Sequence, residues 1–80
     1  MSFSMLPNPA HDHVVIQFDN VTQGATLRIH DMSGRVLFEK RLTDGALSIH
    51  VPVEDFSSGL YSVRLHSGNR GAVLPLMIQR

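Results

Sequence analysis

The chain has 80 residues, 42% of them hydrophobic, and its 7 basic residues balance 7 acidic ones. This length supports one small domain with a modest core, and zero net charge argues against nucleic acid as a partner, because phosphate neutralisation supplies most non-specific affinity. The chain has no cysteine, which excludes disulfides, thiolate zinc sites and thiol catalysis. No apolar run approaches the roughly 18 residues that a membrane-spanning helix needs.

The first residues, Met1 to Met5, lack the basic start and long apolar stretch of a Sec signal peptide. Two interpretations follow: a cytosolic protein, or a piece of a longer exported protein in which Met1 is only the start of the fragment. The motifs described below favour the exported protein, with residues 1–80 as a single domain.

Apolar residues recur at every second position in a series of short segments, which predicts strands with one face in a core and the other in water. The residues expected to face inward are Val14, Ile16, Phe18, Ala25, Leu27, Ile29, Val36, Phe38, Leu42, Leu47, Ile49, Val51, Val53, Tyr61, Val63 and Leu65. The same alternation places His30, His50 and His66 outward. About seven short strands separated by turns predict an all-β, Ig-like antiparallel β-sandwich.

Turn residues stand where the alternation breaks. Pro7-Asn8-Pro9 predicts a bend after a first strand at residues 3–6, because each proline fixes its own φ angle. Residues 31–34 predict a type I turn with Gly34 at positive φ. Asp44-Gly45 and residues 67–71 predict hairpins, and the longer polar segment 55–59 predicts a crossover between sheets.

The last segment, residues 72–78, is apolar on both faces. One face carries Leu74, Leu76 and Ile78. Val73 and Met77 make the other face apolar too, and Pro75 cannot donate to a neighbouring strand, which predicts an edge strand or a bent one. Either a neighbouring loop or sheet covers the second face, or this face is a docking strip for a partner.

Metal binding and catalysis have weak signals in this sequence. His11 and His13 would share one side of an extended segment, but zinc requires three or four ligands, so we predict no metal site. Ser57, Ser58 and Asp55 supply residue types of a catalytic triad without a nucleophile elbow, so we predict no catalytic residue and no cofactor.

Sugar binding has little support either. The chain has no tryptophan, and only Phe3 and Phe56 are left as candidates for stacking on a sugar once the inward-facing aromatics are set aside.

Three blocks of residues occur in order over residues 6–80. The first is Leu6-Pro7-Asn8-Pro9-Ala10 followed by an alternating strand. The second is a strand ending in Asp31-Met32-Ser33-Gly34-Arg35-Val36. The third is Ser58-Gly59-Leu60-Tyr61-Ser62-Val63-Arg64-Leu65 with Gly68 after it. At these spacings the chain resembles the type A C-terminal sorting domain of the type IX (Por) secretion system.

The resemblance implies a non-catalytic sorting signal, that is, a domain that directs the export of the protein that carries it. Such domains are Ig-like sandwiches at the C-terminus of exported proteins of the Bacteroidetes, behind an N-terminal cargo domain that carries a Sec signal. The resemblance implies as partners the outer-membrane translocon, a shuttle barrel protein and a sortase-like cysteine endopeptidase, and it implies a final location at the cell surface or outside the cell. The zero net charge and the lack of a long apolar run predict no nucleic-acid partner and no membrane span.

The resemblance also suggests roles for individual residues. The structural motif comprises Pro7, Asn8, Pro9, Asp31, Gly34 and Arg35. The positions expected to carry recognition are Gly59, Tyr61, Val63, Arg64, Gly68, Leu74, Leu76, Ile78 and Arg80. For Tyr61 we also expect an inward side chain whose hydroxyl bonds to nearby backbone, as in a tyrosine corner.

Alternatives from other classes stay open. Ig-like repeats of the flagellar hook-capping type share these blocks, but they usually place an aromatic after Pro-Asn-Pro, where this chain has Ala10. A structural or adhesive Ig-like module, or a carbohydrate-binding accessory module, would share the same turns. Where the sorting family often carries a lysine near its last strand, this chain offers Arg70 and Arg80.

Overall fold

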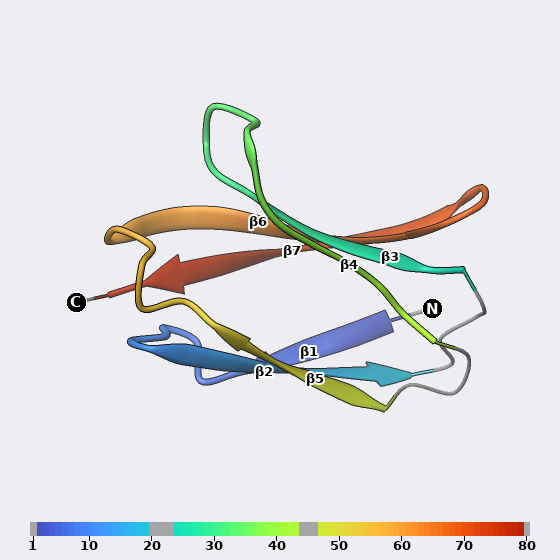
Figure 1. The fold of residues 1–80 in the computed structure, drawn as a ribbon, viewed down its shortest axis with the longest axis horizontal. Helices are drawn as coiled ribbons and strands as arrows, with labels where there is room; N and C mark the ends of the chain where they lie inside the picture. The colour runs from blue at the N-terminus through green and yellow to red at the C-terminus, as the bar shows by residue number, and fades with distance from the viewer. Residues whose placement is uncertain (1, 20–23, 44–46, 80) are drawn as a thin grey trace.

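The computed structural model describes residues 2–19, 24–43 and 47–79, which form seven strands and no helix. The strands are β1 (Ser2–Leu6), β2 (His13–Asp19), β3 (Thr26–His30), β4 (Val36–Arg41), β5 (Ser48–Pro52), β6 (Gly59–Ser67) and β7 (Arg70–Ile78). They make one sheet in the order β1-β2-β5 and a second in the order β4-β3-β6-β7, which lie as two stacked layers (Figure 1). The predicted antiparallel β-sandwich is confirmed.

The core lies between the two sheets and follows the period-two pattern. Its buried apolar side chains are Phe3, Met5, Ala10, Val14, Ile16, Phe18, Ala25, Leu27, Ile29, Leu42, Val51, Val53, Tyr61, Val63, Leu65, Leu76 and Ile78. The alternation confines them to one side of each strand, so that each sheet supplies one apolar face. The core contains no buried polar or charged residue among the described residues.

The prediction fails at β4, where Val36 is 45% exposed rather than inward. The pairing of β3 with β4 shifts register after Ile29, which faces Phe38, so that His30 faces Val36 and Leu37 is left as an extra residue. Such a β-bulge interrupts the alternation. Val36 therefore leaves the inward face, while Leu37 and Phe38 both pack against the core as half-buried residues.

A second failure concerns the connection from β4 to β5. These strands belong to different sheets, so the chain between them is a crossover and not the hairpin predicted at Asp44-Gly45. Residues 44–46 themselves lie outside the described residues. Leu47 was expected to point inward, but it is 79% exposed. It lies just before β5, which is an edge strand of its sheet, so the second sheet does not cover it.

The other turns agree with the sequence. Pro7-Asn8-Pro9 forms the bend between the paired strands β1 and β2, with cis bonds before both prolines. Residues 55–58 carry the chain from β5 in one sheet to β6 in the other. The part of the chain that the structure describes contains no helix long and apolar enough to span a membrane.

Candidate functional site

The last two strands form the longest hairpin of the fold. β6 and β7 pair continuously from Gly59–Ile78 to Ser67–Arg70 around the loop residues Gly68 and Asn69. Gly68 has a φ of +58°, a left-handed conformation that glycine adopts without steric cost. β7 is the outermost strand of its sheet, which is the first of the two arrangements predicted from Pro75.

The residues expected to carry recognition fall into different environments in this hairpin. Val63, Leu76 and Ile78 are fully buried, and Tyr61 is 6% exposed. Leu74 and Gly59 are half-buried, Arg64 and Gly68 are exposed, and Arg80 lies outside the described residues. A partner of the folded domain can touch Arg64 or Gly68 directly, whereas the buried side chains act only by holding the hairpin in shape.

Tyr61 anchors the start of the hairpin. Its hydroxyl donates a hydrogen bond to the carbonyl oxygen of Ser57 at 2.6 Å, and its ring packs beside that of Phe56 with centroids 5.3 Å apart. The expected bond from this hydroxyl to nearby backbone is confirmed. Tyr61 therefore joins the sheet crossover to β6.

The outer face of the hairpin carries an exposed apolar ribbon, which we define as Leu60, Val73 and Met77. Leu60 lies opposite Met77 across the strand pair, and Val73 lies opposite Arg64. Val73 is 59% exposed and Met77 41% exposed, so no neighbouring loop or sheet of the described chain covers this second face of β7. The sequence indicated Val73 and Met77; Leu60 was missed, although it shares the outward side of β6 with Arg64.

The Pro-Asn-Pro corner does more than bend the chain, because residues 8–11 lie along the outer edge of β7. The Asn8 side chain accepts from the Met77 N–H at 3.0 Å and donates to the Pro75 carbonyl at 3.2 Å. Ala10 donates to the Met77 carbonyl and accepts from the Gln79 N–H, both at 2.8 Å. His11 Nδ1 donates to the Gln79 carbonyl at 2.6 Å. We call residues 8–11 the strap.

The turn between β3 and β4 is a closed set of hydrogen bonds. The Asp31 carboxylate accepts from the main-chain N–H groups of Ser33 and Arg35, from the Ser33 hydroxyl and from Arg35 Nε. The Ser33 hydroxyl bond is the main cause that holds the pKa of Asp31 below its usual value. Gly34 has a φ of +92° and donates to the Asp31 carbonyl, so the predicted turn is confirmed.

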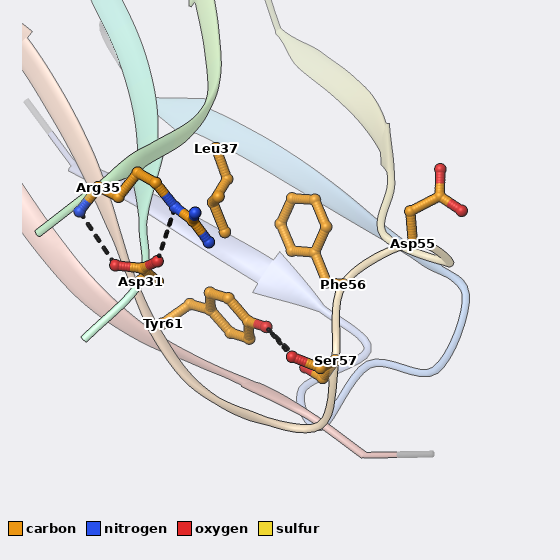
Figure 2. Close-up of a pocket in the computed structure, with 7 residues that line it drawn as sticks. All are labelled: Asp31, Arg35, Leu37, Asp55, Phe56, Ser57 and Tyr61. Atoms are coloured by element: carbon orange, nitrogen blue, oxygen red, sulfur yellow. Dashed lines mark hydrogen bonds and ion pairs between the residues drawn. The ribbon is translucent and has the colours of Figure 1, made fainter. Parts of the chain in front are cut away.

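A pocket of about 270 Å³ opens beside this turn (Figure 2). Its described lining is Asp31, Arg35, Leu37, Asp55, Phe56, Ser57 and Tyr61. Figure 2 shows Arg35 turned to Asp31 and Tyr61 turned to Ser57, while the Asp55 carboxylate points away from the others. Two pairs of these polar groups bond to each other, Arg35 to Asp31 and Tyr61 to Ser57, and the described lining contains no histidine.

Two of the five histidines, His13 and His50, form a stacked pair. The rings of His13 and His50 stack with centroids 5.1 Å apart, and Asp12 accepts from His13 at 2.8 Å, which lowers the pKa of Asp12. His50 and His66 are exposed as predicted, and His30 is half-buried against the Gly34 carbonyl. No group of three or more metal-ligating side chains occurs among the residues described.

The aromatic residues do not form a sugar-stacking surface. Phe3, proposed as a free ring, is buried in the core, and Phe56 is half-buried beside Tyr61. The 4 phenylalanine rings and the 1 tyrosine ring of the chain all lie within the described residues, and none of them is exposed.

Residues 4–79, nearly the whole chain, match the family described as the secretion system C-terminal sorting domain. The chain belongs to this family. It is thus a C-terminal sorting domain of type IX secretion, a family whose cargo is exported to the cell surface or beyond it.

A solved structure supports the fold of this sorting domain. PorZ is described as an essential bacterial surface component of the type IX secretion system of the human oral Porphyromonas gingivalis, and a match to it covers 98% of this chain with a TM-score of 0.72 and 20% identity. The chain spans 11% of the length of that PorZ chain, and at this identity the likeness concerns the fold alone. Among curated proteins, no sequence match was found.

The strap is the part of the sorting domain that sequence reasoning missed. The Pro-Asn-Pro motif predicted a bend, but nothing indicated that Asn8 would bond to β7 almost seventy residues later in the chain. The only hint was Pro75, which marks β7 as an edge strand and therefore as one with main-chain groups to cover.

Proposed function

We propose that this domain is the C-terminal address that directs an exported cargo protein through the type IX secretion system, and that it is not an enzyme. The observation that carries the proposal is the family match over residues 4–79, which spans the sandwich from β1 to the end of β7.

The proposal includes the setting of the domain. Residues 1–80 form one unit behind an N-terminal cargo domain. The translocon, a shuttle barrel protein and a sortase-like cysteine endopeptidase are the partners, and the cargo ends at the cell surface or outside the cell. The exposed ribbon and Arg64 support a surface that is read by protein partners, because both are accessible on the β6–β7 hairpin.

A reporter fusion tests this function. A Sec-exported reporter carrying residues 1–80 at its C-terminus should become accessible to added protease in a cell with a working type IX system. The same fusion in a host without the translocon, and the reporter alone in the competent host, should stay in the periplasm. Periplasmic retention of the full fusion in the competent host, with the domain folded, would overturn the proposal.

Mass spectrometry of the exported reporter separates an address from a permanent module. Removal by an endopeptidase predicts a mature reporter that lacks the domain. A structural or adhesive Ig-like module predicts that the domain stays attached after export.

A further inference from the structure

The outer edge of β7 is divided into two halves. Pro75, Met77 and Gln79 direct main-chain groups away from β6 and toward the strap. Because successive residues of a strand alternate in direction, Gly71 and Val73 direct their N–H and C=O groups to the same outer side. No hydrogen bond from the described residues reaches these groups. The first half of β7, residues 70–74, therefore has outward main-chain groups without a partner among the described residues, and we call it the open half.

The open half has little of the usual protection of an edge strand. Natural edges are blunted by proline, charged side chains or a covering segment. In β7 the proline comes only at Pro75, and the one charged residue of the strand is Arg70, at its first position beside the hairpin loop. The strap shows that this edge accepts an extended chain, since Ala10 forms a parallel bridge with Ile78. An added segment would continue along the same edge toward the hairpin loop.

The side chains beside the open half define what such a segment would carry. On the inner side, Ala72 and Leu74 are half-buried and pack against the core, so they suit apolar neighbours. On the outer side, Val73 is exposed and lies opposite Arg64.

Arg64 is a cation without a carboxylate partner among the described residues. Its partner on the adjacent strand β3 is Arg28, which itself bonds to Glu39. Strands lie about 4.8 Å apart, so a segment added beyond β7 would lie about 10 Å from the β6 backbone, within reach of an arginine paired with an acidic side chain.

We propose that the open edge of β7, at Gly71 and Val73, binds an extended segment of a partner protein as an added strand. Apolar residues of this segment face Ala72 and Leu74, and acidic residues face Arg64. The inference rests on the proposed function, because it makes the partner strand part of the export machinery. The strap limits the added strand to the open half.

Proline substitution tests the edge directly. Val73→Pro removes an N–H that points away from β6 and blocks an approaching strand, while Val73→Thr keeps the N–H and the branched shape. We expect Val73→Pro to reduce surface delivery of the reporter at least about tenfold, and Val73→Thr to leave it near the unsubstituted level. Arg64→Glu, an exposed change that spares the core, should also reduce delivery.

The outcomes separate this inference from the proposed function. If the unsubstituted fusion is not delivered, the proposed function fails. If it is delivered and Val73→Pro is delivered equally well, the added strand is wrong. Circular dichroism and thermal melting establish that each variant is folded, and if Val73→Pro does not fold, Arg64→Glu decides: delivery equal to the unsubstituted fusion overturns the proposal.

A binding experiment needs no export machinery. A short peptide of alternating valine and glutamate, titrated into the 80-residue chain, should shift the amide NMR signals of Gly71 and Val73 and leave Met77 unmoved. A matched valine–lysine peptide should bind far more weakly. Absence of shifts, equal binding of both peptides, or concentration-dependent shifts of these amides without peptide, which indicate a second copy of the chain, would overturn the proposal.

Discussion

The two halves of β7 differ in the hydrogen bonding of their outer edge and in the burial of their side chains. Residues 75–78, together with Gln79 directly after the strand, are hydrogen-bonded to the strap, and they contribute the fully buried Leu76 and Ile78. Residues 70–74 pair with β6 only, and none of their side chains is fully buried. One half therefore holds the sandwich closed, while the other leaves hydrogen-bonding groups available to a partner.

The same leucine-to-alanine substitution in each half of β7 should reveal the largest difference between the two halves. Leu76→Ala empties a buried site and should lower the free energy of unfolding by about 2–5 kcal/mol. Leu74→Ala removes the same atoms from a half-buried site and should cost about 1–2 kcal/mol. Urea denaturation measures both, and equal losses would contradict the division of β7 into a closing half and an open half.

Loss of the strap contacts should have the next largest effect. Asn8→Ala removes both side-chain bonds to Pro75 and Met77 and should lower the free energy of unfolding by about 1 kcal/mol. Amide hydrogen exchange should accelerate at Met77 and stay unchanged at Val73.

Asn8→Asp is the matched control, because it keeps the acceptor for the Met77 N–H and loses the donor to Pro75. An unchanged exchange rate at Met77 in Asn8→Ala would show that the strap does not protect this edge.

A fall in pH should have the smallest effect on the free energy of unfolding, and it should act on Asp31 in the turn between β3 and β4 rather than on β7. The pKa of Asp31 is lowered mainly by the Ser33 hydroxyl bond, so the carboxylate stabilises the fold at neutral pH. This contribution disappears as the pH falls below about 4 and the group becomes protonated in the folded state. Asp31→Asn should therefore be less stable than the unsubstituted chain at pH 7, with the difference shrinking in acid. A difference independent of pH would contradict the ionic role.

Much of the fold was predictable because burial on one face forces a period of two. Val14, Ile16, Val63 and Leu65 are buried where the alternation placed them. Val36 was misplaced because a bulge depends on how β3 pairs with β4, which one strand alone does not reveal.

The candidate site was predictable only in part. The two apolar faces and the proline of residues 72–78 indicated an edge strand whose second face is either covered or a docking strip. The exposure of Val73 and Met77 shows that no described part of the chain covers this face, and docking stays a prediction. Arg64 and Gly68 are accessible, whereas Val63, Leu76 and Ile78 are core residues. A short motif does not distinguish residues that maintain a hairpin from those that a partner touches, so the recognition roles stay predictions.

The sequence alone determined that strands form, which side of most strands is apolar, and where the chain turns, because these follow from side-chain polarity and from the local φ preferences of glycine and proline. Only the tertiary structure decided which strand edges are covered. Asn8 and Met77 are brought together by the stacking of two sheets, and contacts across such a separation depend on the whole chain having folded. The first half of β7 is left open because the strap reaches only residues 75–79.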